Sequence, residues 1–383
     1  MLRADSRKAG RDRVFGRETL FVPFNHAAPG RGRSGLKPAT IRDVAERAHV
    51  SVASVSRVLN GAGPVTEATR QRVLEAVEAL QYVPHSGARS LSTSKTSAVG
   101  VILPDLYGEF FSELIRGMDL AARAHGYHLI VSSSHDDADE ASSAIRSMRG
   151  RVDGLIVLSP HLGAANLASG LAGRMPVLLM NGGVPADGRP SIVVDNHGGA
   201  VAAVEHLIAT GRRRIAHIAG PAGNLEAEAR LAGYVQAMAA AGLPTMVVDG
   251  AFTKVSGEEA GAKLAARTDR PDAVFAANDN MAVGALLAFQ DAGLRVPEDV
   301  AMVGFDDIPL AGLVRPALTT LKIEIAEMGR NALERLVRLI GSAVDTACEV
   351  VRPELVVRAS SNPLISPSGA SGAAPTDVQK MSL

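Results

Sequence analysis

Three short segments between residues 40 and 82 carry apolar side chains at helical spacing. Thr40, Ser51 and Thr66 precede these segments, and all three are residue types that cap helix N-termini. The apolar positions are Ile41, Val44, Ala45 and Ala48, then Val52, Val55, Val58 and Leu59, then Val73, Leu74, Val77 and Leu80. Because only His49 and Val50 separate the first two segments, the pattern predicts a helix-turn-helix domain of three helices over residues 38–82.

Strand-sized apolar runs alternate with longer amphipathic segments from residue 98 to residue 362. The expected strands are 98–103, 127–132, 152–158, 176–180, 191–194, 214–219, 246–249, 272–276 and 300–304. The expected helices include 109–125, 196–210, 225–241, 256–267 and 278–292. This alternation predicts an α/β core of doubly wound parallel sheets. A stretch of about 265 residues is long for one such sheet, so two lobes are expected.

Three further segments lack a sustained apolar period. Residues 1–37 are rich in Arg and Gly and are predicted to form a disordered basic arm. Residues 83–97 form a polar hinge linker, in which about two helical turns would be marginally stable alone. Residues 363–383, rich in Ser, Gly, Ala and Pro, are expected to be a disordered tail.

The formal net charge of zero hides an asymmetry along the chain. Residues 1–95 hold 16 Lys and Arg against 8 Asp and Glu, whereas the remaining 288 residues hold 24 against 32. A basic front end suggests that this part meets a polyanion. The chain has no membrane-length apolar run and no apolar core of a secretory signal, so a cytoplasmic location is expected.

Few residues suit catalysis or metal binding. Cys348 is the single cysteine, which excludes an intramolecular disulfide framework and a multi-cysteine metal site. Catalytic serine, zinc-protease and phosphate-loop motifs are absent, so neither enzyme activity nor a cofactor is expected. The acidic run 135–140 could attract a divalent cation, but it lacks EF-hand spacing and is better interpreted as a solvated helix start.

Several motifs follow one another in an order that identifies a family. The N-terminal motifs are Ala39-Thr-Ile-Arg-Asp-Val-Ala-Glu-Arg-Ala48, Ser51-Val-Ala-Ser-Val-Ser-Arg-Val-Leu-Asn60, Val65-Thr-Glu-Ala-Thr-Arg-Gln-Arg-Val-Leu74 and Tyr82-Val-Pro-His-Ser-Gly-Ala-Arg-Ser-Leu91. The core motifs are Val99-Gly-Val-Ile-Leu-Pro-Asp105, Asp153-Gly-Leu-Ile-Val157, Arg230-Leu-Ala-Gly-Tyr234, Ala277-Asn-Asp-Asn-Met-Ala282 and Val303-Gly-Phe-Asp-Asp307. Together they closely resemble the lac/galactose repressor (LacI/GalR) family. The resemblance implies a two-lobed effector core similar to periplasmic sugar-binding proteins of type I.

The sequence departs from the family pattern at two positions. The turn between the first two helices usually carries Gly, and here it carries His49. His tolerates a positive φ better than most residues, so the turn remains possible at a higher cost. Residue 85 is His where the family usually has Asn.

The resemblance places the second helix in the major groove of DNA. Val52 and Ala53 would touch a thymine methyl at best, whereas Arg57 would make a bidentate contact with guanine. The alternative is that Val52 belongs to the core and Arg57 is a solvated charge. The remaining positions of this set suit phosphate contacts or helix caps. They are Thr40, Ser51, Ser54, Ser56, Asn60 and Thr66.

The resemblance also implies that Leu91 acts as a wedge. A pair of such leucines, one from each subunit of a homodimer, would enter the minor groove at the centre of a pseudo-palindromic operator. Ala88 and Arg89 would line the same hinge helix. The alternative is that Leu91 docks on the core.

The candidate effector site lies between the lobes, near the C-terminal ends of strands. Three polar residues suit a polyol. Asp306 can accept hydrogen bonds from hydroxyl groups, Arg230 can donate them, and Asn278 can do both. Phe110 and Phe252 could stack on its apolar face. Asp105 and Asn181 follow strands and complete the set. Each also has a purely structural alternative, as a cap, a surface charge or a core residue.

These features favour a ligand-controlled transcriptional regulator, more specifically a repressor, with a sugar as effector. A nucleobase or nucleoside effector is the alternative within the same fold. A transporter's sugar-binding protein would need an export signal and no DNA-binding domain, and an enzyme would need a catalytic constellation.

We predict that Leu91→Ala weakens operator binding, because the variant loses the apolar wedge that kinks the duplex. A gel-shift or anisotropy titration of operator DNA measures the effect. If the variant binds operator as tightly as the wild type, Leu91 does not act as a wedge.

Overall fold

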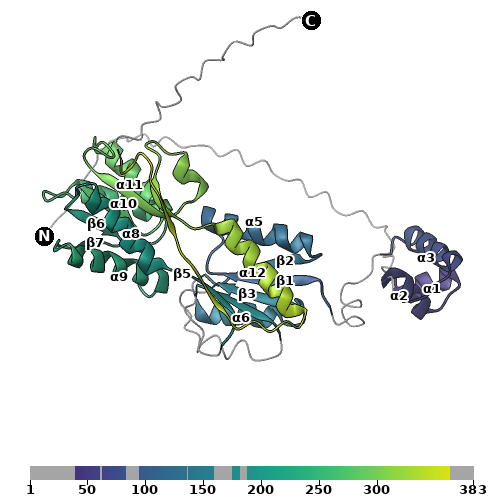
Figure 1. The fold of residues 1–383 in the computed structure, drawn as a ribbon. Helices are drawn as coiled ribbons and strands as arrows, with labels where there is room; N and C mark the ends of the chain where they lie inside the picture. Colours follow the sequence, from purple (N-terminus) through teal and green to yellow (C-terminus); the bar gives the residue numbers. More distant parts are fainter. Residues whose placement is uncertain are drawn as a thin grey trace, which may run out of the picture. The chain divides into compact units, whose positions relative to one another are not determined.

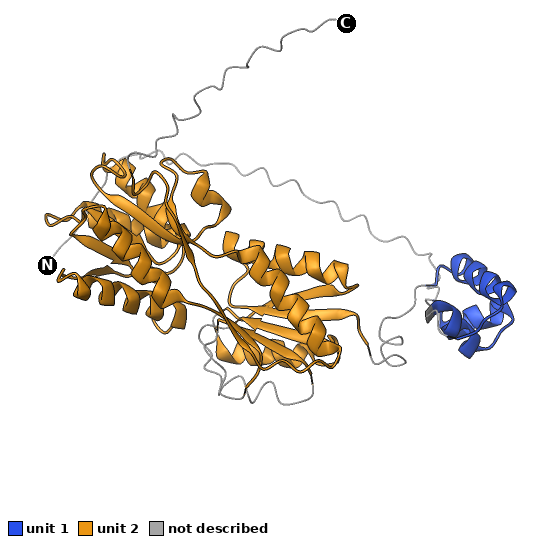
Figure 2. Cartoon of the chain, viewed as in Figure 1, with its two compact units in different colours: residues 1–84 blue, residues 85–383 orange. Residues whose placement is uncertain are grey.

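The computed structural model describes residues 39–82 except 61 and 62, residues 95–158 except 136, residues 175–181 and residues 188–362. The chain divides into two compact units, residues 1–84 and residues 85–383 (Figure 2). The predicted arm, the hinge residues Ala88, Arg89 and Leu91, and the predicted tail lie outside the described residues.

The smaller unit consists of helices α1 (Ile41–Ala48), α2 (Val52–Asn60) and α3 (Glu67–Ala79). Val44, Val55 and Val73 are fully buried at its centre. Leu74 was predicted on the packed face of α3, but it is 46% exposed. Residues 73, 76, 77 and 80 share one helical face, and Leu74 lies about 100° away from it. The buried Ala76 takes the place expected for Leu74.

The caps and the tight turn follow from the residue types in this unit. The Thr40 amide donates to Asp43 Oδ2 at 2.7 Å, and the Asp43 amide donates back to Thr40 Oγ1, which forms a capping box. His49 adopts the left-handed conformation with φ 51°, and the Val50 amide closes the turn on the Ala45 carbonyl. The expectation that this turn places a positive φ on His49 is confirmed.

The larger unit contains two six-stranded sheets, one in each lobe (Figure 1). The first sheet has the order β11-β5-β4-β3-β1-β2, and its neighbouring strands are parallel. Its strands are β1 (Ala98–Leu103), β2 (His128–Ser133), β3 (Gly154–Leu158), β4 (Val177–Met180), β5 (Ser191–Val194) and β11 (Cys348–Val351). The predicted doubly wound parallel architecture is therefore confirmed for this lobe.

The second sheet has the order β12-β10-β9-β8-β6-β7 and is parallel except for the antiparallel edge pair β10 and β12. Its strands are β6 (Ile215–Ile218), β7 (Met246–Val248), β8 (Ala273–Ala276), β9 (Ala301–Asp306), β10 (Thr319–Lys322) and β12 (Glu354–Val356). The sequence interpretation omitted β10, β11 and β12. The edge strands β11 and β12 are short and partly exposed, so they carry little apolar pattern.

Helices cover both sheets. The first lobe contains α5 (Glu109–Ala124), α6 (Ala138–Met148) and α12 (Ile325–Ile340), and the second contains α8 (Asn196–Ala209), α9 (Leu225–Ala240), α10 (Lys254–Ala265) and α11 (Asp279–Asp291). A short 3-10 helix, η1 (Pro309–Gly312), follows β9. Helices α5 and α12 approach so closely that a Cβ at Gly117 would lie 1.8 Å from the Ala326 carbonyl oxygen. None of the described helices is long and apolar enough to cross a membrane.

The chain passes between the lobes three times, at residues 194–196, 322–325 and 351–354. After the second passage the chain returns from the second lobe to the first, where α12 packs on α5 and β3. Each passage begins at the C-terminal end of a strand, since residues 194, 322 and 351 end β5, β10 and β11. The lobes are therefore joined by short connections that can rotate without unfolding either sheet.

His217 is fully buried in the second lobe. Its ring stacks between Tyr234 and Phe275, with centroid distances of 5.1 and 4.9 Å. Nδ1 lies 2.9 Å from the Phe275 carbonyl oxygen, which accepts its hydrogen, whereas Nε2 has no partner. Burial lowers the pKa of His217 to about 4, because a charged imidazole would lose its hydration there.

We predict that this imidazole makes the larger unit acid-sensitive. Between pH 6.5 and about 4 the unfolded chain binds a proton that the folded chain does not. The free energy of unfolding therefore falls with falling pH, by about 3 kcal/mol from this group. Urea unfolding at several pH values gives the dependence of the free energy of unfolding on pH. This dependence should be weaker in His217→Asn than in the wild type, and unchanged in the exposed control His128→Asn. The same pH dependence in all three proteins would contradict the assignment to His217.

Candidate functional site

A cavity of about 140 Å³ lies between the two lobes of the larger unit. An apolar cavity of about 150 Å³ is known to accommodate benzene, so this one has room for a single six-membered ring. The first lobe contributes Pro104, Asp105, Tyr107, Gly108, Phe110, Phe111 and Leu158 to its wall. The second lobe contributes Pro221, Asn224, Glu226, Arg230, Ala251, Phe252, Thr253, Asn278, Asn280 and Asp306.

Arg230 is the centre of the polar wall, because its guanidinium contacts both Asn196 and Asp306. It comes from α9 and is only 4% exposed, so the alternative of an exposed helix charge is wrong. Nε donates to Asn196 Oδ1 at 2.8 Å and Nη1 donates to the Ala277 carbonyl at 2.5 Å. The guanidinium lies 3.8 Å from the ring centroid of Phe305, a cation–π contact. These contacts fix the plane of the guanidinium, and Nη2 is left facing Asp306.

Asp306 ends β9 and is 5% exposed. Its Oδ1 lies 3.5 Å from Arg230 Nη2 and has no hydrogen-bond partner. Burial raises the pKa of this carboxyl to about 7, although the nearby Arg230 opposes the rise and Glu226 adds to it. An acceptor oxygen without a donor in a pocket wall is suited to a ligand that brings a donor.

Asn278 has a different geometry from the one that the sequence suggests. It caps α11, with Oδ1 accepting from the Met281 amide, while Nδ2 donates to the Phe252 carbonyl at 3.0 Å. The side chain therefore holds the Phe252 turn, whose φ is 58°, against the cavity. The ring of Phe252 lies 5.8 Å from the Arg230 guanidinium.

The two first-lobe candidates in the cavity lie at its rim. Asp105 is exposed, and its Oδ1 accepts from the amides of Leu106 and Tyr107, which shapes the loop after β1. Phe110 is partly buried and packs edge-on against Phe111 at 5.4 Å. The structure brings these two residues to the same cavity as Arg230 and Asp306.

Asn181 lines a separate hollow of about 230 Å³, together with Asn196 and Glu226. It is 4% exposed, and neither its Oδ1 nor its Nδ2 has a hydrogen-bond partner. The structure therefore does not place Asn181 on the wall of the cavity that holds Asp306. Glu226 lines both spaces, which makes them neighbours.

Sequence reasoning missed Asn196 and Glu226. Asn196 directly follows the first passage between the lobes and bonds Arg230, so its position after an expected strand was an available signal. Glu226 is in the first turn of α9, next to the cap Asn224. An acidic residue there is ordinarily read as a partner of the helix dipole.

The candidate DNA-facing residues lie on one side of α2. Val55 and Val58 are buried, whereas Val52 is 41% exposed and Ala53 and Arg57 are exposed. The alternative that Val52 belongs to the core is therefore wrong. Ser51 Oγ accepts from the Ser54 amide at 3.1 Å, so Ser51 caps α2.

The acidic run after β2 is a helix start. Asp137 caps α6, and its Oδ1 accepts from the amides of Asp139 and Glu140 at 2.8 Å. The described part of the chain contains no group of three or more His, Cys, Asp or Glu that could hold a metal ion.

Comparison with known families gives two matches. Residues 40–85 match the family described as "Bacterial regulatory proteins, lacI family". Residues 204–361 match the family described as "Periplasmic binding protein-like domain". The first covers the three-helix unit, and the second covers most of the second lobe together with α12 and β11.

Individual relatives match most of the chain. Catabolite control protein A of Priestia megaterium is 36% identical over 304 residues, which are 78% of this chain and 92% of that protein. The crystal structure of the lac repressor dimer bound to operator and the anti-inducer ONPF is 30% identical with a TM-score of 0.75, covering 85% and 99% of the two chains. The structure of a transcriptional regulator CelR–cellobiose complex is 33% identical with a TM-score of 0.60, covering 84% and 99%.

We predict that Asp306 makes the folded protein less stable as pH rises from 4 to 7. The folded chain keeps a proton on this carboxyl up to about pH 7, whereas the unfolded chain releases it near 3.8. The free energy of unfolding therefore falls by about 4 kcal/mol from this group across that window. In urea titrations, Asp306→Asn should not show this fall in the free energy of unfolding between pH 4 and 7. The exposed control Asp249→Asn should show it as the wild type does. An Asp306→Asn protein with the wild-type pH profile would contradict the prediction.

Proposed function

The chain belongs to the lacI family of bacterial regulatory proteins and is a DNA-binding transcriptional repressor, and we propose that the cavity between its lobes binds a sugar that controls operator affinity. The observation that carries the proposal is the carboxylate oxygen Oδ1 of Asp306, which is ion-paired with the fixed guanidinium of Arg230 at 3.5 Å but accepts no hydrogen bond, in a ring-sized cavity. A sugar hydroxyl donates to a carboxylate and accepts from a guanidinium, so it satisfies both groups.

A sugar also suits the remaining wall of the cavity. Phe110, Phe111 and Phe252 offer apolar faces of the kind that stack on the C–H face of a sugar ring. Of the described residues on the wall, three carry carboxylates (Asp105, Glu226 and Asp306) and one carries a guanidinium. Such a wall favours a neutral ligand with many donors over an anion. The CelR relative, whose structure contains cellobiose, supports the same class of ligand.

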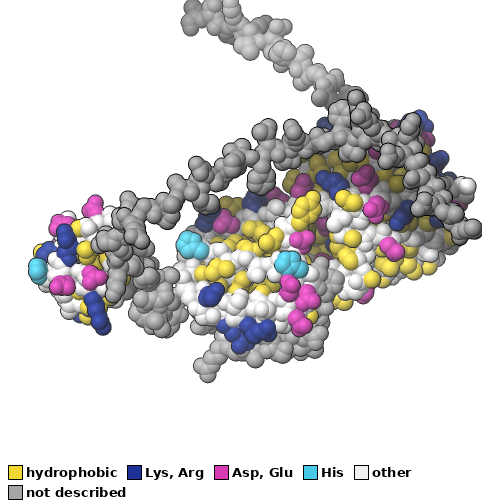
Figure 3. Space-filling model, turned by 180° about the vertical axis from the view of Figure 1, so that it is seen from behind, with side chains coloured by type: hydrophobic (Ala, Val, Ile, Leu, Met, Phe, Trp, Pro, Cys, Tyr) yellow, Lys and Arg dark blue, Asp and Glu magenta, His cyan; other side chains and the backbone are white. Residues whose placement is uncertain are grey.

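We place operator contacts on the exposed side of α2. Val52 and Ala53 at its start would contact thymine methyl groups, and Arg57 would contact guanine in the major groove. The predicted phosphate contacts are Thr40, Ser51, Ser54, Ser56 and Asn60, and the predicted hinge contacts are Ala88, Arg89 and Leu91. On the face drawn in Figure 3, both units mix Lys and Arg with Asp and Glu side chains, so this assignment depends on the positions of the motif residues in α2 rather than on surface charge. Phosphate contacts would make operator affinity fall steeply with salt.

A homodimer would let two copies of the small domain read two half-sites of a pseudo-palindrome. The edge strand β2 and the helix α5 expose Ile130 and Leu120, which are 40% and 56% accessible, and we propose that these side chains contact the second copy. The lac repressor relative forms a dimer on its operator. Because the operator lies in the cytoplasm of a bacterium, we assign the protein to that compartment.

Ligand binding would control operator affinity by changing the angle between the two lobes. A sugar contacting Phe110 on one lobe and Asp306 on the other would stabilise one orientation of the lobes. The first lobe is tied to the last residues of the hinge linker, since Asp153 accepts from the amides of Thr96 and Ser97 at 2.6 and 2.9 Å. A rotation of this lobe would therefore move the C-terminal end of the linker, and with it change the spacing of two DNA-binding domains.

We predict that neutral sugars raise the melting temperature of the wild-type protein. A ligand at about 100 times its Kd stabilises the fold by about 2.7 kcal/mol. At about 2–4 °C per kcal/mol for domains of 150–250 residues, this raises the melting temperature by about 5–11 °C. Thermal-shift assays would use D-galactose, D-ribose and cellobiose, with cytidine and hypoxanthine for the alternative effector class. The shift should disappear in Asp306→Ala and Arg230→Ala and persist in the exposed control Asp249→Asn.

The outcomes separate the site from the ligand class. A sugar shift that survives both alanine substitutions would contradict the proposed site. If cytidine or hypoxanthine raises the melting temperature and no sugar does, the protein is still a ligand-controlled regulator. Its effector is then a nucleoside or nucleobase rather than a sugar.

A further inference from the structure

The turn that presents Asp306 to the cavity is strained. Asp306 and Asp307 have φ values of 109° and 57°, so two successive non-glycine residues occupy the positive-φ region. Such conformations are unfavourable for residues with a Cβ and persist only where the surrounding structure holds them. The turn is continued by Ile308, which is 2% exposed, and then by η1.

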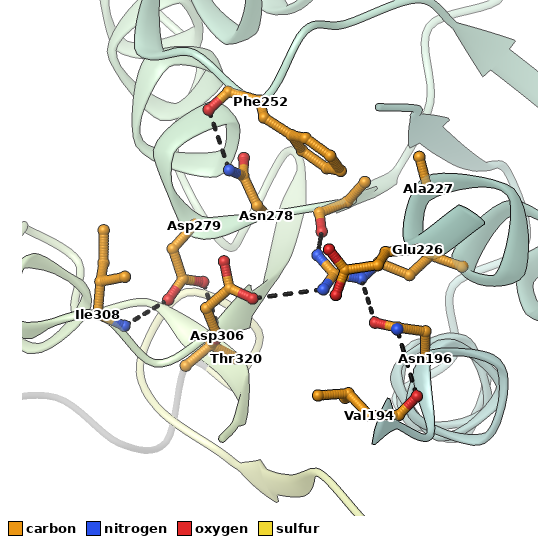
Figure 4. Close-up of polar contacts among 12 residues, drawn as sticks. Val194, Asn196, Glu226, Ala227, Phe252, Asn278, Asp279, Asp306, Ile308 and Thr320 are labelled. Atoms are coloured by element: carbon orange, nitrogen blue, oxygen red, sulfur yellow. Dashed lines mark hydrogen bonds and ion pairs between the residues drawn. The ribbon is translucent and has the colours of Figure 1, made fainter. Parts of the chain in front are cut away.

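The buried carboxylate of Asp279 holds the turn in place. Asp279, the first residue of α11, is fully buried, and its Oδ2 accepts from the Ile308 amide at 3.0 Å. Its Oδ1 accepts from the Thr320 hydroxyl on β10 at 2.6 Å (Figure 4). Asp279 therefore connects the turn to the helix that carries Asn278 and to the neighbouring strand. It occupies the space beside Gly304, where a Cβ would lie 2.1 Å from Oδ1.

A second contact comes from the C-terminal segment after β12. Arg358 Nη1 lies 2.7 Å from Asp307 Oδ1 and also donates to the Leu318 carbonyl at 2.8 Å. The Arg358 amide donates to Thr319 Oγ1 at 2.8 Å, which anchors the segment to β10. Both side chains of the ion pair are largely buried, at 23% and 13% exposed, so the pair is better shielded from water than a surface salt bridge.

We propose that Arg358 and Asp307 are a positioning pair for ligand recognition, which holds the strained turn so that the Asp306 carboxylate faces the cavity. The inference rests on the proposed function, because it takes Asp306 as the group that contacts the ligand. Neither Arg358 nor Asp307 lines the cavity. Their effect on binding is therefore exerted through the backbone of the turn.

Two substitutions of Asp307 separate a backbone role from a charge role. Asp307→Ala and Asp307→Gly both remove the ion pair, but only glycine adopts φ 57° without strain. Ligand affinity should therefore be weakened in the alanine variant and largely kept in the glycine variant. The left-handed conformation costs about 1–2 kcal/mol for a residue with a Cβ, so the Kd of Asp307→Gly should be at least about five-fold lower than that of Asp307→Ala.

The experiment uses the full chain and calorimetric titration. The probe is whichever of D-galactose, D-ribose and cellobiose shifts the wild-type melting temperature most. Arg358→Ala should raise the Kd by about ten-fold, which corresponds to about 1.4 kcal/mol. Arg270→Ala is the control, since Arg270 is an exposed arginine of the same lobe that does not line the cavity, and it should leave the Kd unchanged. Circular dichroism without sugar verifies that each variant is folded.

A ligand-free measurement tests the same turn. Hydrogen exchange at the amides of Ile308 and Leu310 should be faster in Arg358→Ala than in the wild type, and close to wild type in Arg270→Ala. Unchanged exchange, or a glycine variant as weak as the alanine variant, would overturn the proposal. If Asp306→Ala binds the probe as the wild type does, or no probe binds at all, the proposed function fails and this inference fails with it. If Asp306→Ala loses the probe while Arg358→Ala keeps it, only the positioning pair fails.

Discussion

The buried guanidinium of Arg230 is the interaction on which the site depends. A buried charge is costly unless its hydrogen bonds and its counter-charge are supplied, and removing one partner of such a group typically destabilises a protein by several kcal/mol. Here the partners come from the first passage between the lobes (Asn196), the end of β8 (Ala277) and the end of β9 (Asp306), while Phe305 covers one face of the group. One side chain thus fixes the spacing of two strand ends and of an inter-lobe connection.

This arrangement links recognition to motion. The cavity takes its wall from both lobes, and the chain segments between the lobes are short. The Leu310 amide donates to Glu109 Oε2 at 3.2 Å, so the loop that carries Asp306 also touches the N-terminal end of α5 across the cleft. A ligand that changes the position of this loop therefore changes a contact between the lobes, which is the physical requirement for transmitting occupancy to a distant domain.

Strain and burial are concentrated around the same loop. Asp306, Asp307 and Phe252 all adopt positive φ, and Asp279 is a buried carboxyl whose pKa is raised by burial and by the nearby Asp306. Outlier conformations and perturbed carboxyls gather at binding sites because the rest of the fold can hold them. In this protein the holding groups belong to α11, β10 and the C-terminal segment, so the second lobe is organised around the presentation of one carboxylate.

The sequence by itself determined the three-helix unit, the parallel α/β core and the identity of Arg230, Asp306 and Phe252 as wall residues, because helix caps, apolar periods and family motifs are local signals. It did not determine the edge strands β11 and β12, which are short and half exposed, or the exposure of Leu74. Tertiary structure alone decided that Asn278 uses its amide within the protein, that Asn181 lines a neighbouring hollow, and that Asn196, Asp279 and Arg358 support the site. Those roles depend on contacts between residues tens of positions apart, and such contacts arise only when the sheets have folded.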